Sequence, residues 1–139
     1  MRAPVSSSDQ LELLVETSAL VAILFEEPEW EEFTDDIVEA KYGTPSIHIF
    51  ETVLALAKLA ATPPTDAHER VSRLVERLKI AVIPYTPESP PHAVSARERY
   101  GRGRKGLNMG DCLSYAAARH LGLTLLYTGD DFARTDVNG

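Results

Sequence analysis

Short apolar runs alternate with longer amphipathic segments along this chain, and the alternation restricts the folds available to it. Three of the runs, LELLVE at residues 11–16, AVIPYT at 81–86 and LTLLYT at 123–128, have the length and composition of buried strands. Strands separated in sequence by helices pair in parallel, and the helices cover both faces of the sheet. The sequence therefore predicts an α/β domain with a central parallel sheet.

Six segments beside these runs space their hydrophobic residues as helices do. They cover residues 19–25, 29–41, 49–61, 66–80, 90–101 and 111–121. Thr17 or Ser18 is expected to cap the first helix, and Gly122 to terminate the last. The second helix is expected to bury one face, made by Trp30, Phe33, Ile37 and Val38. The stretch YGTPS, residues 42–46, predicts only a turn or a very short strand.

At 139 residues the chain is expected to form one domain over residues 11–139, preceded by a flexible extension over residues 1–10. No apolar run approaches the roughly 18–20 residues of a membrane span, and the first residues lack the apolar stretch of a secretory signal. Cys112 is the single cysteine, which excludes an internal disulfide and suits a reducing compartment. These features predict a cytoplasmic protein with no membrane partner.

Charge is distributed unevenly along the chain. The net charge is −7, yet the segment RERYGRGRK at residues 97–105 carries +4, which leaves −11 for the remainder. A segregated basic segment predicts contact with the phosphates of a nucleic acid, which the acidic remainder alone would repel. A solvated loop that only keeps the protein soluble is the alternative. The residues predicted to contact RNA are Arg97, Arg99, Arg102, Arg104 and Lys105.

Acidic side chains stand where the predicted strands end and the predicted helices begin. Glu16 ends the first strand, Glu51 lies near the start of an apolar helix, and Asp111 begins another helix. Asp130 and Asp131 follow the last strand. Ligands of parallel sheets bind beyond the carboxyl ends of the strands. All five acids are therefore placed to meet at one rim of the sheet.

Carboxylates gathered within a few ångström repel one another, which raises their pKa values and lowers stability. A divalent cation offsets this repulsion, and hard oxygen ligands favour Mg²⁺ or Mn²⁺. Such a cation lowers the pKa of water and neutralises the charge that develops when a phosphodiester is cleaved. Together with the basic segment, the acids predict hydrolysis of phosphate esters in a polymer.

Each acid also has an ordinary structural explanation. Asp111 suits the N-terminus of a helix, and Glu51 suits a solvated first turn. Asp130 and Asp131 suit a turn after a glycine. Glu16 differs, because a carboxylate between two apolar stretches is rarely left merely solvated. Spacing along the chain does not establish that these side chains converge.

The stretches that carry these acids resemble the PIN-domain ribonucleases, and within them the VapC toxins of bacterial toxin–antitoxin pairs. The likeness runs from about Leu13 to Val137, with the motifs LLVETSALVAILFEEPE, IFETVLALAKL, RYGRGRKGLNMGDCLSYAAA and LLYTGDDFARTDV in order. The resemblance implies a PIN-like fold and a Mg²⁺- or Mn²⁺-dependent endoribonuclease that cuts structured RNA such as tRNA or ribosomal RNA. It also implies a homodimer, or a hetero-oligomer with a VapB-type antitoxin that silences the enzyme.

By their positions in these motifs, Glu16, Glu51 and Asp111 take the places of the family's first three metal-binding and catalytic acids. In the terminal motif GDDF, Asp130 is assigned as the fourth catalytic acid because it comes first after the strand. Asp131 is assigned as a further metal ligand. The side chains expected to steady water or the carboxylates are Thr17, Ser18 and Thr128.

Glu16 departs from the family pattern, in which the first acid is ordinarily Asp. Glu carries one more methylene, and a misplacement of about 1 Å costs about 10²-fold in rate. The resemblance therefore implies a ribonuclease attenuated at this position. A catalytically silent module that binds RNA or the antitoxin is the alternative, and a phosphatase acting on small esters is a weaker one.

The other conspicuous side chains carry less information. Cys112 has no histidine at nucleophile spacing, which favours a packed position in its helix. The histidines, His48, His68, His92 and His120, lack the spacing of a zinc site. The aromatic side chains of Trp30, Tyr100, Tyr115 and Tyr127 are expected in the core or at an interface. For Tyr100, in the basic segment, stacking on a base is the alternative. The helical face around Trp30, Phe33 and Ile37 is a candidate groove for an antitoxin segment.

Overall fold

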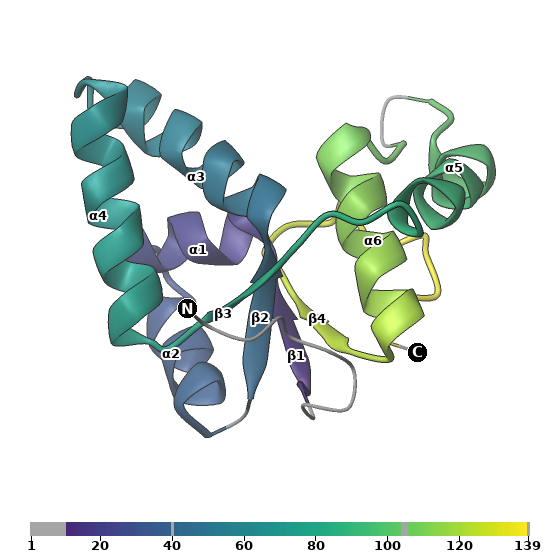
Figure 1. Ribbon diagram of the computed structural model, residues 1–139, viewed down its shortest axis with the longest axis horizontal. Helices are drawn as coiled ribbons and strands as arrows, with labels where there is room; N and C mark the ends of the chain where they lie inside the picture. The colour runs from purple at the N-terminus through teal and green to yellow at the C-terminus, as the bar shows by residue number, and fades with distance from the viewer. Residues whose placement is uncertain (1–10, 40, 104–105, 139) are drawn as a thin grey trace.

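The computed structural model describes residues 11–39, 41–103 and 106–138, and its strands form one parallel sheet with helices on both sides (Figure 1). Each strand pairs in parallel with its neighbours, in the order β3-β2-β1-β4. The predicted α/β class with a central parallel sheet is confirmed. The strands are β1 (Leu13–Val15), β2 (Tyr42–Pro45), β3 (Ala81–Ile83) and β4 (Thr124–Leu126).

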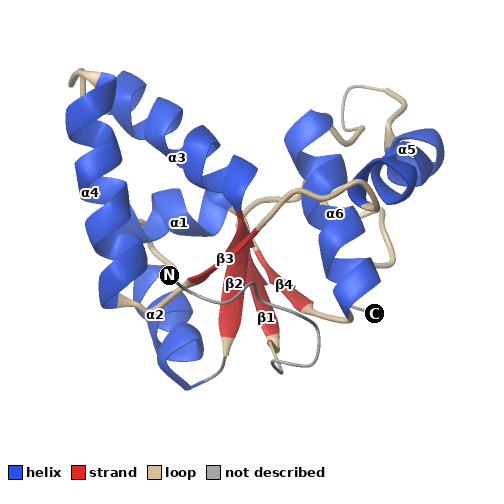
Figure 2. Cartoon of the chain, in the orientation of Figure 1, coloured by secondary structure: helices blue, strands red, loops and turns tan. Residues whose placement is uncertain are grey.

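The first four helices lie on one side of the sheet, and the last two lie on the other (Figure 2). Side chains along a strand alternate in direction, so neighbouring residues of β1 serve the two sides. Leu14 is fully buried in the core beneath α6, and Val15 in the core beneath α1. This division explains why the strand is apolar throughout. The helices are α1 (Thr17–Leu24), α2 (Trp30–Glu39), α3 (Ser46–Leu59), α4 (Pro64–Arg77), α5 (Ser89–Tyr100) and α6 (Met109–Leu121).

Strand β2 is the element that the sequence predicts least clearly. Gly43 and Pro45 both weaken strand propensity, yet all four residues of β2 are buried. A Cβ at Gly43 would lie 3.0 Å from the side chain of Ile83 and 3.1 Å from that of Leu11. The glycine therefore lets β3 and the residues before β1 pack closely on β2. Pro45 takes the last position of the strand, directly before α3.

The predicted helix boundaries agree with the structure to within three residues, but the predicted buried face of α2 contains an error. Phe33 and Ile37 are buried, whereas Val38 is 73% exposed. Each step along a helix turns the side chain by about 100°, so Val38 points away from the face that Phe33 and Ile37 share. The expected antitoxin groove around these two residues is also wrong, because both side chains belong to the core.

All strands run in the same direction, so their carboxyl ends meet along one edge of the sheet. Helices α1 and α3 begin directly after β1 and β2 at this edge. Helix α6 runs back toward the start of β4, which places its own N-terminus near the same edge (Figure 1). The topology therefore collects the helix starts and strand ends that carry the predicted acids.

Some predictions fall on residues outside the described ranges. The expected extension over residues 1–10 is one of them, and Arg104 and Lys105 of the basic segment are the others. The boundaries proposed for a single domain, 11–139, stay a prediction. Across the described part of the chain, no helix combines the length and apolar character that a membrane crossing requires.

Candidate functional site

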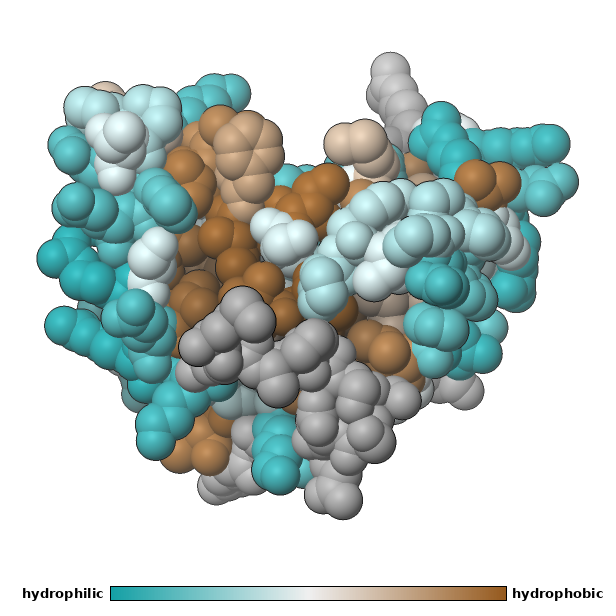
Figure 3. Space-filling view, viewed as in Figure 1, coloured by the Kyte–Doolittle hydropathy of each residue, from teal (hydrophilic) through white to brown (hydrophobic). Residues whose placement is uncertain are grey.

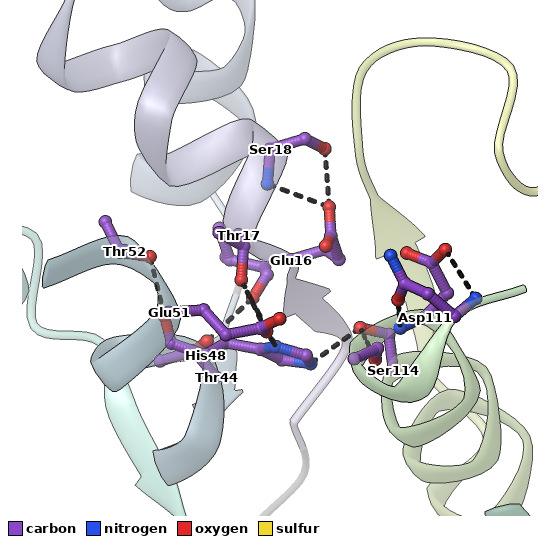
Figure 4. A network of polar contacts seen from close by, with 12 residues as sticks. Glu16, Thr17, Ser18, Thr44, His48, Glu51, Thr52, Asp111 and Ser114 are labelled. Carbon is purple, nitrogen blue, oxygen red and sulfur yellow. Dashed lines mark hydrogen bonds and ion pairs between the residues drawn. The ribbon is translucent and has the colours of Figure 1, made fainter. Parts of the chain in front are cut away.

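Three of the predicted acids, Glu16, Glu51 and Asp111, face one another at the edge of the sheet where the strands end (Figure 4). The charges of Asp131, Glu16 and Glu51 all raise the pKa of the Asp111 carboxyl, so all three lie within electrostatic reach of it. The structure thus brings together four acids from four places in the chain: the end of β1, α3, α6 and the segment after β4.

Glu16 is held by the first turn of the helix that follows it. It is 6% exposed, and its Oε2 accepts hydrogen bonds from the Ser18 backbone N–H at 2.8 Å and from Ser18 Oγ at 2.5 Å. Glu16 itself is therefore the N-cap of α1, in place of the predicted Thr17 or Ser18, because its long side chain folds back onto the helix. The Thr128 backbone N–H donates to Ser18 Oγ at 2.9 Å, which ties α1 to the segment after β4.

Glu51 is held by hydrogen-bond donors from two helices. Thr17 Oγ1 donates to Glu51 Oε1 at 3.0 Å, and His48 Nδ1 lies 2.5 Å from the same oxygen. The hydrogen bond from His48 is the main cause that lowers the pKa of Glu51, and it outweighs the opposing effect of burial. This carboxylate is therefore fixed in its ionised form.

His48 is a site residue that the sequence prediction missed. Its side chain is fully buried, and its Nε2 lies 2.6 Å from Ser114 Oγ of α6. Ser114 Oγ is also 3.2 Å from the carbonyl oxygen of Gly110, to which it can donate. Because Nδ1 faces a carboxylate, the hydrogen-bond network assigns a proton to that nitrogen. His48 thus links Glu51 on α3 to the first turns of α6 (Figure 4).

One signal for this role was present in the sequence. His48 and Glu51 are three residues apart, which places them on the same face of a helix. The partner on α6, Ser114, lies 66 residues further along the chain. That contact depends on how α3 and α6 pack, which no local pattern specifies.

Asp111 is buried at the start of α6. It is 7% exposed and completes a capping box with Asn108: the Asn108 backbone N–H donates to Asp111 Oδ2 at 3.1 Å, and the Asp111 backbone N–H donates to Asn108 Oδ1 at 2.9 Å. Burial, more than any charge, raises the pKa of Asp111 to about 6, and the neighbouring carboxylates add to the increase. Asp111 therefore does cap its helix, and it also carries a charge that this environment disfavours.

Gly110 allows the walls of the site to approach each other. A Cβ at this position would overlap Glu51 Oε2, and it would lie 2.9 Å from both Cδ and Oε1 of the same side chain. Only glycine leaves room for the Glu51 carboxylate against the first turn of α6. The glycine of the GDC motif is thus explained by a contact with an acid that lies 59 positions earlier in the sequence.

In each of the three buried or half-buried acids, one oxygen is anchored and the other is not. Among the described residues, no donor reaches Glu16 Oε1, Glu51 Oε2 or Asp111 Oδ1. No three acidic, histidine or cysteine side chains of the described part are gathered tightly enough to hold a metal ion as they stand. The donor set nevertheless fits Mg²⁺ or Mn²⁺, because it offers only hard carboxylate oxygens that repel one another until a cation joins them.

The two acids of the GDDF motif lie in the segment after β4. Asp131 is one of the charges that raise the pKa of Asp111. Both side chains are exposed. Asp131 thus lies within electrostatic reach of Asp111, and the choice of Asp130 as the fourth acid, made from the sequence, stays a prediction.

The described residues of the basic segment divide into two groups. Arg97 Nη1 donates to the Leu107 carbonyl oxygen at 2.7 Å, so this side chain closes the loop after α5. Arg99 and Arg102 instead line a cavity that they share with Asp131. Cys112 is buried in the core, and burial raises the pKa of its thiol, as expected for a packed cysteine.

Comparison with known proteins gives a consistent set of matches. A family model, described as the PIN domain, matches residues 13–138. A VapC ribonuclease of Rhizobium meliloti is 34% identical over 138 residues, covering 88% of this chain and 97% of its own length. Ribonuclease VapC30 of Mycobacterium tuberculosis is 34% identical over 131 residues, covering 90% of this chain and 95% of its own length.

Solved structures match the same length of chain. The Mycobacterium tuberculosis toxin VapC20, which cleaves the sarcin–ricin loop, superposes with a TM-score of 0.70 at 15% identity, over 91% of this chain and 96% of that one. A DNA-bound VapBC complex from Salmonella typhimurium gives a TM-score of 0.66 at 18% identity, over 91% and 94%. At these identities the structural likeness supports the fold.

Proposed function

Because this chain belongs to the PIN-domain family, and within it to the VapC ribonucleases, we propose that it is the toxin of a toxin–antitoxin pair and cuts structured RNA, such as tRNA or ribosomal RNA, with Mg²⁺ or Mn²⁺. The observation that carries the metal-dependent part is the pairing of one anchored and one unpartnered oxygen on Glu16, Glu51 and Asp111. The anchored oxygens fix the side chains, and the others remain to bind a cation.

Glu16, Glu51, Asp111 and an aspartate of the GDDF motif would hold the cation. When bound, it lowers the pKa of water and neutralises charge on the phosphodiester. The chain's own groups fix the geometry: His48 and Thr17 orient Glu51, Ser18 orients Glu16, and Asn108 orients Asp111. A misplaced carboxylate slows the reaction, so these contacts support the rate by keeping each carboxylate in position.

The position of the Glu16 carboxylate is evidence for slower cleavage than an aspartate at this position would give. Its carboxylate reaches back to Ser18 and caps α1, so its position is tied to the helix as well as to the site. We propose that the longer side chain shifts the cation and slows cleavage. The same observation favours the second candidate function, a catalytically silent module that binds RNA or an antitoxin.

We propose a VapB-type antitoxin as the protein partner, with α3 as part of its surface. Phe50 and Leu54 are 61% and 48% exposed, and they lie one helical turn apart beside Glu51. Two large exposed apolar side chains at this spacing suit an apolar segment of a partner. An arginine from such a segment would reach the unpartnered carboxylate oxygens and silence the site.

A second copy of the chain is the other partner we propose. Hydrophobic residues gather across the face seen in Figure 3. Tyr85, Val94 and Met109 line one groove and are each more than half exposed, which is the arrangement of an interface that a partner covers. Val94→Asp should shift the protein from dimer to monomer in sedimentation velocity. An unchanged dimer would place the interface elsewhere.

The experiment that tests the proposed activity is incubation with total RNA in Mg²⁺, Mn²⁺ or EDTA, followed by sequencing of new 5′ ends. We expect cleavage at a few sites that depends on the cation and is lost in Asp111→Asn. Specific binding of RNA or antitoxin without any cut in either metal would favour the silent module.

A further inference from the structure

A cavity of about 290 Å³ lies between the C-terminal end of α5 and the segment after β4, with Asp131 in its wall. Its wall is made by residues from these two parts of the chain, and they include Asp131 of the GDDF motif. The lining residues are Arg99, Tyr100, Arg102, Leu107, Asp131, Arg134 and Thr135. Among the described residues, three guanidinium groups and one carboxylate line this wall, so the wall is positive in a chain whose net charge is −7.

Arg99 is held in place by its neighbours. Its Nη2 lies 3.8 Å from Asp136 Oδ2, its Nη1 lies 3.5 Å from the Tyr115 hydroxyl, and its guanidinium carbon lies 4.9 Å from the centre of the Tyr100 ring. These contacts fix the side chain at the mouth of the cavity. Arg99 is therefore a preorganised cation at this wall.

Arg102 and Arg134 differ from Arg99 in having no ion-pair partner among the described residues. Within the described ranges, neither guanidinium makes a hydrogen bond or an ion pair, although both line the same cavity. They come from different segments, so the fold, and not the local sequence, brings them together. Unpaired guanidinium groups that converge on a cavity are suited to bind a phosphate through two parallel hydrogen bonds each.

Asp131 connects this cavity to the carboxylates. It lines the cavity, and its charge also acts on Asp111. A polyanion bound at the acids would therefore have the arginine wall beside it. We propose that this cavity is a phosphate subsite, in which Arg102 and Arg134 hold a phosphate of the RNA strand close to the one that is cut. The subsite rests on the proposed function, and it assigns a role to Arg134, which lies outside the basic segment.

The test uses short labelled RNAs that span a cleavage site found with total RNA or, where no RNA is cut, the RNA segment that the chain binds most tightly. Each phosphate in turn is replaced by an uncharged methylphosphonate. Binding is measured by fluorescence anisotropy in EDTA, so that cleavage does not interfere. For the unmodified chain, we expect one neutral linkage near the cut to weaken binding several-fold. In the variant Arg102→Ala/Arg134→Ala, that linkage should no longer matter.

The salt dependence gives an independent readout. Each phosphate contact with a single strand contributes about 0.7 to the slope of log K against log salt. Because the two arginines hold one phosphate, the double variant should lower the slope by about 0.7. The matched control is Arg70→Ala/Arg73→Ala, which removes two exposed arginines from α4 on the other side of the sheet. The control should bind RNA with the unaltered slope.

The outcomes separate this subsite from the nuclease itself. RNA that is cut while the double variant behaves like the control overturns the subsite and leaves the nuclease standing. RNA that binds with the predicted arginine-dependent linkage but is never cut supports the subsite and removes the nuclease. A poly-aspartate peptide is tested in the same assay. If the double variant no longer binds this peptide but binds RNA as the unmodified chain does, the subsite is overturned in favour of an acidic protein partner. If the two arginines are needed to bind inorganic phosphate, but no neutral linkage weakens the binding of RNA, the subsite is overturned in favour of a site for a free anion.

Discussion

Glu51 and Asp111 lie on helices that face each other across one site, yet their pKa values move in opposite directions. The pKa of Glu51 is lowered, whereas that of Asp111 is raised to about 6. The first belongs to a wall formed by α1 and α3, and the second to a wall formed by α6 and the segment after β4. Both carboxylates are partly or wholly withdrawn from water, so burial alone does not explain the difference.

The difference lies in the hydrogen-bond donors of each wall. The α1–α3 wall supplies His48 and Thr17 to the Glu51 carboxylate, and both stabilise its charge. The α6 wall supplies one backbone N–H to Asp111, and the charges of Glu16, Glu51 and Asp131 act against it. One wall is therefore preorganised for negative charge, and the other carries a negative charge that its surroundings disfavour.

The largest effect that tests this comparison is the replacement of Asp111 by Asn. Asn keeps a side-chain oxygen for the capping box but removes the disfavoured charge. In EDTA at pH 7.5, Asp111→Asn should raise the free energy of unfolding by about 2–3 kcal/mol, as expected for a shift of about two pKa units. Urea denaturation measures the change. A variant less stable than the unmodified chain would show that the charge of Asp111 is not disfavoured.

The pH dependence of stability supplies the control. Asp111 has its folded pKa raised from 3.8 to about 6, so the metal-free protein should lose stability as the pH rises from about 4 through 6. Glu51 has its folded pKa lowered below 4.5, so its contribution should be lost as the pH falls below that value. Asp111→Asn should abolish the first slope and keep the second. Glu51→Gln should do the reverse.

A smaller effect is expected from His48. His48→Ala leaves Glu51 Oε1 and Ser114 without their shared partner, and such losses typically amount to about 1–3 kcal/mol. Stability should fall by that amount, and the affinity for Mn²⁺ should fall as well because Glu51 is no longer held. Urea denaturation measures the stability, and calorimetric titration measures the Mn²⁺ affinity. Ser114→Ala, which removes only the contact to Nε2, should lower both by a smaller amount. Unaltered Mn²⁺ affinity in His48→Ala would reduce this residue to a packing role.

The smallest of the three effects concerns Glu16. Glu16→Asp should increase RNA cleavage at least tenfold, which corresponds to about 1.4 kcal/mol of barrier, because the shorter acid lets the cation return to the position that the other acids favour. Initial rates on one RNA substrate measure this change. Glu16→Ala should be no faster than the unmodified chain. Equal rates for Glu and Asp would mean that the longer acid is a tolerated ligand.

Most of the fold follows from sequence patterns, because strand apolarity and helix periodicity are local. The sequence predicts strand β2 only as a turn or a very short strand. Gly43 makes room for the packing of Ile83 and Leu11, and such a contact leaves no local pattern. The sequence also assigns Val38 wrongly to the buried face of α2. An apolar residue next to Ile37 cannot be told from a buried one by its type alone.

The site was predictable where an acid stands at the end of an element, as Glu16, Glu51 and Asp111 do. His48 was missed because its partners on α1 and α6 are far away in sequence. The choice between Asp130 and Asp131 depends on the path of the turn after β4, and adjacent identical residues give no basis for it. Arg134, which we propose for the phosphate subsite, is not predicted from the sequence because it is a single charge outside the basic segment.

The central claim is that both walls hold one cation, and a Mn²⁺ titration of the melting temperature tests it most directly. A ligand that binds only the folded state raises the melting temperature by mass action. We expect a clear rise for the unmodified chain and for the control Glu69→Gln on α4, and we expect most of that rise to be lost in both Asp111→Asn and Glu51→Gln. A rise that survives intact in either of these two variants would contradict the claim, because that wall would then take no part in binding.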